Sequence, residues 1–277
     1  MKTSDYLKKY GVSLKKSLGQ NFLSSEEYAN RIVEALNIEK GDKILEIGAG
    51  AGTLTISLAK TGAKIYAIEI DNRMEPILKE RLSEYTNVDL IFEDFLKLDI
   101  SFLPDGYKCV SNIPYYITAP IIKKLIFTKF DVLYLMMQRE VGERLQEKPG
   151  SSNRGFLSVV LQTVADLEKV FMVPKSAFVP NPEIDSIVLR IKKKSSIPFV
   201  SSEELLSYWE FVSSCFGQKR KTIYNNLKTF RLERTTIESI LRGISKNARP
   251  EQLTNDEFVS IWRRWEVEKT SLDGGNI

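Results

Sequence analysis

The sequence predicts an α/β fold, in which a mainly parallel, doubly wound sheet is followed by a small all-helical domain. Three observations support this prediction. Short apolar runs alternate with helical stretches through residues 43–137, and two further strand-like runs follow them. Beyond residue 198 the apolar residues recur with the period of a helix. Alternating strands and helices indicate βαβ units with right-handed crossovers, and therefore a parallel sheet.

Five short apolar runs predict buried strands of this sheet. They are Lys43–Ile47, Lys64–Glu69, Val88–Phe92, Tyr107–Ser111 and Val132–Met137. Helical stretches are expected between them, near 53–60, 73–85 and 119–127. Two more strands are expected at Leu167–Val173 and Ser186–Lys192, joined by a proline-rich connection.

A domain boundary is predicted near residue 198, because Lys193–Ser202 mixes charge, serine and proline. The expected first domain covers residues 1–198 and begins with a basic segment, 1–23. Residues 199–277 form the expected helical domain.

Charge is distributed unevenly along the chain. Lys and Arg number 40 against 36 Asp and Glu in 277 residues, a small excess. The stretch from Cys215 to Arg249, however, holds nine basic and two acidic residues, and the first 16 residues repeat this bias. Phosphate contacts by Lys and Arg supply most non-specific nucleic-acid affinity, so a polyanionic partner is one interpretation. A solvated charged face is the other.

The residues that are absent restrict the chemistry. The chain contains no histidine, which excludes Ser/His/Asp and Cys/His catalysis and His-ligated zinc. Its two cysteines, Cys109 and Cys215, are far apart and form no metal-binding pair, as expected in a reducing cytoplasm. No apolar run reaches the ~20 residues that span a bilayer. A cytoplasmic protein with no membrane partner is therefore expected.

A glycine-rich turn follows the first strand and predicts a nucleoside site. Glu46-Ile-Gly-Ala-Gly-Ala-Gly52 lets the backbone approach a ligand closely, at Gly48 and Gly50 above all. Thr53 stands where a dinucleotide fingerprint needs glycine, so a nucleoside without a pyrophosphate fits better. The acids that end the next two strands extend the site. Glu69 is placed to accept from ribose hydroxyls and Asp94 from an adenine amine, with Ile70 and Phe95 covering the ring.

Asn112-Ile113-Pro114-Tyr115-Tyr116, at the end of the fourth strand, resembles the signature of methyltransferases that act on the exocyclic amine of adenine. That amine is a poor nucleophile, and two acceptors aimed at its hydrogens favour the more tetrahedral nitrogen needed for attack. The Asn112 side-chain oxygen and, by resemblance, the Ile113 carbonyl supply them, held by the rigid Pro114. Tyr115 is expected to stack on the flipped base, with Phe178 on its second face.

Together these motifs resemble the ribosomal RNA adenine dimethyltransferase family. Further matching segments are Lys16–Leu23, Gln138–Leu145, Arg154–Val159, Phe178–Ser186, Phe216–Thr222 and Arg249–Leu253. The resemblance implies a Rossmann-like, seven-stranded class I methyltransferase sheet with an antiparallel edge hairpin. It also implies S-adenosylmethionine as methyl donor, S-adenosylhomocysteine as product and no metal. Donor-binding residues carried over from the family are Asn21, Leu23, Gly48, Glu69, Asp94 and Asn112.

The family's small-subunit branch dimethylates two adjacent adenosines in the 3′-terminal hairpin of 16S RNA during ribosome maturation. The resemblance therefore implies small-subunit RNA as partner, within an immature 30S particle, and a monomeric enzyme. Its basic RNA-facing segments match Lys219, Arg220, Lys221 and Arg249. Two departures, Ala49 for a frequent proline and Ser111 for a small Gly or Ala, affect loop rigidity rather than the polar contacts.

Three alternatives remain open at this point. The branch that methylates 23S RNA and confers antibiotic resistance shares the glycine loop and the Asn-Ile-Pro-Tyr sequence. A non-enzymatic RNA-binding assembly factor could use the same fold, although Asn112, Tyr115 and Glu69 are intact. A nicotinamide dehydrogenase is the general α/β alternative, which Thr53 disfavours.

Overall fold

The computed structural model describes residues 2–14, 19–218 and 220–273, without the side chains of residues 115 and 271–273. The described chain forms two compact units. Of the described residues, unit 1 comprises those up to 142 together with 166–193, and unit 2 comprises 143–165 together with those from 194 to 273.

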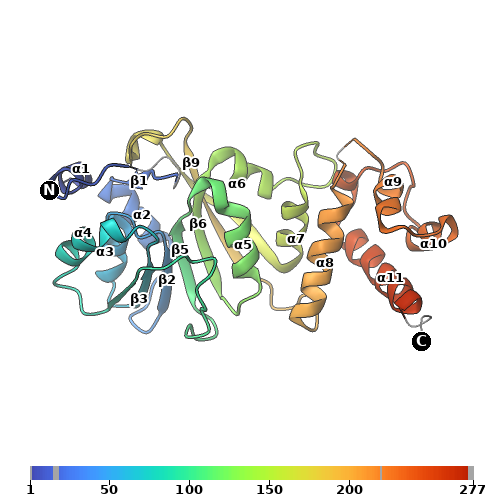
Figure 1. Ribbon diagram of the computed structural model, residues 1–277, viewed down its shortest axis with the longest axis horizontal. Helices are drawn as coiled ribbons and strands as arrows, with labels where there is room; N and C mark the ends of the chain where they lie inside the picture. Colours follow the sequence, from blue (N-terminus) through green and yellow to red (C-terminus); the bar gives the residue numbers. More distant parts are fainter. Residues whose placement is uncertain (1, 15–18, 219, 274–277) are drawn as a thin grey trace. The chain divides into compact units, whose positions relative to one another are not determined.

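Unit 1 is built on a seven-stranded sheet with the strand order β4-β3-β2-β5-β6-β9-β7 (Figure 1). The strands are β2 (Lys43–Ile47), β3 (Lys64–Ile68), β4 (Val88–Ile91), β5 (Lys108–Asn112), β6 (Val132–Gln138), β7 (Ala165–Val173) and β9 (Ser186–Lys193). The pairs among β2 to β6 are parallel, and β9 joins β6 antiparallel. This confirms the predicted fold class, including the antiparallel element at one end of the sheet.

Helices connect and cover the strands of unit 1. They are α1 (Thr3–Lys9), α2 (Glu26–Ala35), α3 (Thr53–Ala59), α4 (Glu75–Arg81), α5 (Thr118–Ile126) and α6 (Arg139–Leu145). Short 3-10 helices are η2 (Asn72–Met74), η3 (Tyr115–Ile117) and η4 (Lys175–Ala177). The last three residues of α6 belong to unit 2. The helices predicted near 53–60, 73–85 and 119–127 are confirmed as α3, η2 with α4, and α5.

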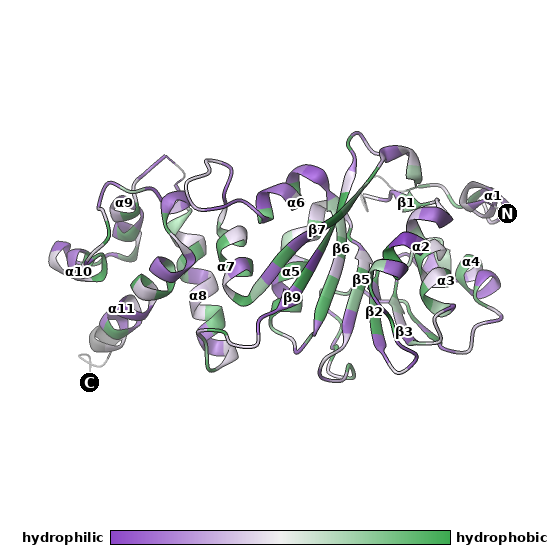
Figure 2. Cartoon of the chain, turned by 180° about the vertical axis from the view of Figure 1, so that it is seen from behind, coloured by the Kyte–Doolittle hydropathy of each residue, from purple (hydrophilic) through white to green (hydrophobic). Residues whose placement is uncertain are grey.

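Alternation along the strands places the sheet between helical layers. One core cluster joins apolar residues from one face of the strands to the inner faces of α2, α3 and α4. Its members include Ile32, Ile44, Leu58, Ile65, Leu78, Val110 and Tyr134. In Figure 2 the strands carry long hydrophobic stretches, whereas α6 is mostly hydrophilic. Because both faces of β2 and β5 and most of β3 are buried, the ends of these strands are the positions left for polar function.

A two-stranded sheet brings the N-terminal segment to the same unit. In it β1 (Phe22–Leu23) pairs antiparallel with β8 (Phe178–Val179), and Leu23 lies opposite Phe178. The sequence pattern had not indicated this pairing, because two-residue strands carry no periodic signal.

Unit 2 is helical and holds α7 (Phe156–Val164), α8 (Ser202–Cys215), α9 (Ile223–Leu227), α10 (Arg234–Ile240) and α11 (Asn255–Asp273), with η5 (Lys228–Phe230) and η6 (Pro250–Gln252). Aromatic rings of α8 and α11 fill its core; Tyr208 and Trp262 lie 5.7 Å apart between centroids. The side chain of Arg154 is buried and donates to the Leu253 carbonyl and to Asn255 Oδ1. The sequence pattern predicts a helical domain that starts at residue 199. In the structure, residues 143–165, which the prediction assigns to the first domain, belong to the same compact unit as these helices.

Within the described residues, no helix has both the length and the apolar character needed to cross a bilayer.

Candidate active site

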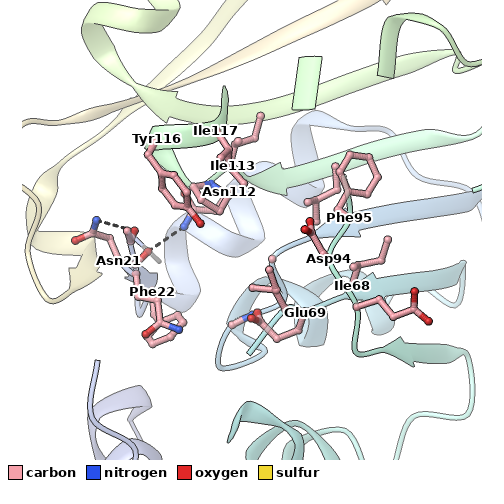
Figure 3. Close-up of a pocket in the computed structure, with 18 residues that line it drawn as sticks. Asn21, Phe22, Ile68, Glu69, Asp94, Phe95, Asn112, Ile113, Tyr116 and Ile117 are labelled. Atoms are coloured by element: carbon pink, nitrogen blue, oxygen red, sulfur yellow. Dashed lines mark hydrogen bonds between the residues drawn. The ribbon is translucent and has the colours of Figure 1, made fainter. Parts of the chain in front are cut away.

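A cavity of about 730 Å³ opens at the carboxyl ends of β2, β3, β4 and β5 (Figure 3). Because these strands are parallel neighbours, the loops that follow them meet at one edge of the sheet. The lining residues are Gly19, Gln20, Asn21, Phe22, Ile47, Gly48, Gly50, Ile68, Glu69, Ile70, Glu93, Asp94, Phe95, Asn112, Ile113, Pro114, Tyr116 and Ile117.

The glycine loop forms the wall next to β2. Gly48 and Gly50 have φ angles of +79° and +56°, a left-handed conformation that L side chains rarely adopt. A Cβ built on Gly50 would lie 2.6 Å from Phe22 Cδ1, so the Phe22 ring packs directly on this bare backbone. The Gly48 and Ala49 amides donate to the Ile68 carbonyl at 2.8 and 3.0 Å, which fastens the loop to the end of β3.

Glu69, the residue after β3, lines the cavity and is buried. Its carboxylate accepts from the Gly50 amide at 2.7 Å and from the Asp71 amide at 2.8 Å. Burial raises the pKa of this carboxyl, against the opposing effect of the two amides. Each oxygen accepts one of these bonds and keeps a further lone pair, which suits acceptance from ligand hydroxyls. Ile70, next in the chain, is 47% exposed and lines the cavity.

Asp94 and Phe95 form the wall beyond β4. Asp94 Oδ1 accepts from the Leu96 amide at 3.0 Å, which fixes the turn, and Phe95 is buried. Lys124 on α5 donates to the carbonyls of Phe95 and Leu98, and its Nζ lies 4.8 Å from the centroid of the Phe95 ring. Burial lowers the pKa of Lys124. The helix that follows the Asn-Ile-Pro-Tyr sequence therefore also supports the loop of Asp94 and Phe95.

Asn112, the last residue of β5, presents an unused acceptor. Its Nδ2 donates to the Asn21 carbonyl at 3.0 Å (Figure 3). Its Oδ1 is buried and has no hydrogen-bond partner among the residues that the structure describes. An unpaired buried acceptor costs about 1–3 kcal/mol, so this atom is poised to bind a donor from a ligand. Ile113 and Pro114 follow it on the cavity wall.

Tyrosine 116, which the sequence interpretation left without a role, lines the cavity and is 54% exposed. Its ring lies against Gly19, where a Cβ would come within 2.8 Å of Tyr116 Cδ1. The side chain of Tyr115, to which stacking was assigned, lies outside the described part of the chain. The stacking role of Tyr115 stays a prediction.

Leu23 and Phe178 do not line the main cavity. Phe178 is fully buried in the core cluster opposite Leu23, so a stacking role, which stays a prediction, requires its ring to become accessible when RNA binds. Leu23 lines a smaller hollow of about 280 Å³ on the other side of Phe22. Glu46 lies in this hollow, completely buried, and burial raises the pKa of its carboxyl to about 8.

The structure therefore brings together most of the predicted donor-binding residues, and it adds some that the sequence interpretation missed. Asn21, Gly48, Gly50, Glu69, Ile70, Asp94, Phe95 and Asn112 share one cavity. The additions include Gln20, Phe22, Ile68, Glu93, Tyr116 and Ile117. Each lies within two residues of a predicted one, so the signal that could have found them was proximity along the chain.

The predicted RNA-binding residues gather in unit 2. Arg220, Lys221 and Arg249 are exposed, and none of them has a carboxylate within ion-pair distance in the described residues; Lys219 is outside that range. The buried Asn226 holds their loop, because its Oδ1 accepts from the Gln218 amide and its Nδ2 donates to the carbonyls of Gln218, Lys221 and Thr222. The Ile223 amide donates to the Ala248 carbonyl at 2.8 Å, which brings Arg249 beside this loop.

No group of three or more metal-ligating side chains that could hold a metal ion occurs among residues 2–14, 19–218 and 220–273.

Comparison with known proteins finds ribosomal RNA methyltransferases similar to this chain. A family model described as ribosomal RNA adenine dimethylase matches residues 11–266. A protein of Thermotoga maritima called ribosomal RNA small subunit methyltransferase A is 51% identical over 265 residues, covering 96% of this chain and 90% of its own. A Bacillus thuringiensis protein of the same name is 40% identical over 285 residues, with 98% and 97% coverage.

Two solved structures are similar across most of the chain. A dimethyladenosine transferase from Plasmodium falciparum superposes with a TM-score of 0.75 at 27% identity, covering 90% of this chain and 98% of its own. The 23S rRNA methyltransferase ErmE gives a TM-score of 0.67 at 25% identity, with 89% and 100% coverage.

Proposed function

The chain belongs to the ribosomal RNA adenine dimethylase family, and from this premise we propose its reaction and substrate. It transfers methyl groups from S-adenosylmethionine to the N6 amines of two adjacent adenosines in the 3′-terminal hairpin of 16S RNA. The product is N6,N6-dimethyladenosine. The enzyme acts as a cytoplasmic monomer on RNA within an immature 30S particle, and it needs no metal.

The residues of the cavity fit the methyl donor. Glu69 offers buried carboxylate oxygens for the ribose hydroxyls, and Asp94 offers an acceptor for the adenine amine. Ile70 and Phe95 provide apolar surface for the ring, and the bare backbone at Gly48 and Gly50 admits a ligand closely. When bound, the donor supplies an activated methyl group on a sulfonium.

The chain's own part in the reaction is to position and polarise the target amine. Asn112 Oδ1 accepts from one amine hydrogen, and the Ile113 carbonyl accepts from the other. These bonds favour the tetrahedral nitrogen that attacks the methyl. No general base is required, because the methylated ammonium is acidic enough to release its proton to water. Holding the amine in line with the methyl supplies much of the remaining rate.

The assignment to small-subunit RNA is supported by the relatives that cover the full chain. Those at 40–51% identity carry the name ribosomal RNA small subunit methyltransferase A, and their similarity includes unit 2. The enzyme named for 23S RNA is less similar, at 25% identity. The basic loop of Arg220 and Lys221 offers unpaired cations for the RNA phosphates.

One observation carries the proposal: a buried acceptor without a partner, Asn112 Oδ1, lies in the same cavity as Glu69 and Asp94. A catalytically inactive assembly factor would gain nothing from this uncompensated group.

The test is mass spectrometry of ribosomal RNA from cells that lack the gene. We expect dimethyladenosine to be missing from two adjacent positions of 16S RNA and to return with the wild-type gene. Dimethyladenosine that persists in 16S RNA, or that is lost from 23S RNA instead, contradicts the proposal.

A further inference from the structure

We infer that Asp71 and Arg73 are positioning residues, which act through Gln20 and the Asn21 backbone to hold the Asn112 amide in its productive orientation. The inference rests on the proposed function of Asn112 as the acceptor for the target amine. It assigns a task to two charged residues that lie outside the cavity lining.

Asp71 is the centre of this arrangement, which we call the Asp71 clamp (Gln20, Asp71 and Arg73). Asp71 is 5% exposed and follows Glu69 by two residues. Its Oδ2 accepts from Arg73 Nη2 at 2.6 Å and from Gln20 Nε2 at 2.9 Å. Its Oδ1 accepts from Arg73 Nε at 2.8 Å and from the Arg73 amide at 3.2 Å. A buried carboxylate with four such donors is fully satisfied, and therefore rigid.

Arg73 extends the clamp to a second point of the N-terminal segment. Its Nη1 donates to the Ser13 carbonyl at 2.9 Å. The segment is thus held to the end of β3 through Ser13 and through Gln20. A simple helix cap at Asp71 would require only the bond from the Arg73 amide, and neither the Gln20 contact nor the Ser13 contact serves that purpose.

The clamp is connected to Asn112 by one residue. Asn21 follows Gln20, and its carbonyl accepts from Asn112 Nδ2 at 3.0 Å (Figure 3). On its other side Phe22 begins β1 and packs against Gly50. The Asn21 carbonyl is therefore fixed from both directions. Because it takes the amide nitrogen, the oxygen of Asn112 is the atom left for the substrate.

A rotated Asn112 would present donors to the amine instead of an acceptor, and two donors facing each other repel. Loss of the clamp should consequently lower the transfer rate even when both substrates are saturating. The pKa of Asp71, which the bonds from Arg73 lower to about 2, keeps the carboxylate charged throughout the working range of pH.

The experiment compares four variants of the full-length enzyme. Asp71→Asn and Gln20→Glu each break the Gln20–Asp71 contact, the first by placing an amide nitrogen opposite the Gln20 Nε2 donor and the second by opposing two carboxylates. The combination Gln20→Glu with Asp71→Asn restores an amide facing a carboxylate. Lys9→Met is the matched control, because it removes an ion pair with Glu80 elsewhere in the same segment.

Two quantities are measured. The first is hydrogen exchange of the Asn112 side-chain amide by NMR in the free enzyme. The second is the single-turnover transfer rate with saturating S-adenosylmethionine and 30S substrate. We expect each single variant to speed exchange and to slow transfer about tenfold or more, since misplacement of a reacting group by 1 Å can cost up to about 10²-fold. The double variant should recover part of both, and Lys9→Met should change neither.

Unchanged exchange in Asp71→Asn and Gln20→Glu overturns the inference, as does a change confined to the KM for S-adenosylmethionine. Failure of the proposed function has a different signature. In that case the clamp variants still expose the Asn112 amide to exchange, but Asn112→Ala itself transfers methyl groups at the wild-type rate.

Discussion

The donor cavity of unit 1 and the basic loop of unit 2 differ in how firmly their polar and charged groups are held. In the cavity the buried Glu69 is held by fixed partners, the Gly50 and Asp71 amides, and Asn112 is held through its Nδ2 by the Asn21 carbonyl. In the loop, Arg220 and Lys221 are exposed and only the backbone beneath them is fixed, by the buried Asn226. The first arrangement selects one ligand by shape and hydrogen bonding, whereas the second attracts a polyanion by charge. Single changes should therefore be severe in the cavity and gradual in the loop.

The largest effect on binding is expected from Gly50→Ala. The new Cβ would face Phe22 Cδ1 at 2.6 Å while the residue keeps a φ of +56°, so both the glycine loop and the Phe22 ring must shift. We expect the affinity for S-adenosylmethionine, measured by calorimetry, to fall about 10²-fold, equivalent to roughly 3 kcal/mol. Gly106→Ala is the control, because Gly106 has a φ of +79° but no atom within 4 Å of its Cβ position. Equal losses in both variants would show that backbone strain, and not the contact with Phe22, explains the result.

A smaller effect, spread over several residues, is expected in the basic loop. Replacing Arg220, Lys221 and Arg249 together with alanine should weaken RNA binding and reduce the slope of log K against log salt by about 2, at roughly 0.7 per phosphate contact. S-adenosylmethionine affinity should stay the same. A matched variant replaces Arg234 and Lys246, which are already paired with Glu238. A salt slope that is unchanged in the triple variant would remove the loop from the RNA interface.

The effect with the least influence on ligand binding concerns stability and its dependence on pH. Burial raises the pKa of Glu46 to about 8 from 4.5, so between these values the folded chain retains a proton that the unfolded chain has lost. The free energy of unfolding should therefore fall as pH rises through this window. Glu46→Gln removes the effect, so the Tm of this variant should match that of the wild type near pH 4 and exceed it near pH 8. The corresponding gain in the free energy of unfolding near pH 8 is at most a few kcal/mol. A constant Tm difference across this range would mean that Glu46 is ionised in the folded protein.

The sequence predicts those features of the cavity that depend on the local pattern of residues. Strand runs and the residues just after them located Glu69, Asp94 and Asn112, because parallel strands bring their carboxyl ends together. The family and the enzyme class, an S-adenosylmethionine-dependent rRNA adenine dimethyltransferase, were predicted from ordered motifs and are confirmed by the family match and the relatives.

The sequence pattern does not predict which residues far apart in the chain contact one another. The bond between Gln20 and Asp71 joins residues 51 positions apart, and no periodicity encodes it. Residues 143–165 likewise belong to unit 2 because of long-range contacts, such as the packing of Phe156 on Trp209 at 5.4 Å between ring centroids. Tyr116 was missed for a different reason: the motif alone does not specify the turn that follows Pro114, and that turn places Tyr116 on the cavity lining.

The role of Asn112 is tested most directly by measuring methyl transfer and RNA binding side by side in Asn112→Ala. We expect a single-turnover rate lower by roughly 10²–10³-fold or more, as for loss of one preorganised group that stabilises a transition state. The dissociation constant for 30S substrate should remain close to that of the wild type. A variant that transfers methyl groups at the normal rate, or that loses rate and RNA affinity to the same extent, would contradict the role assigned to this amide.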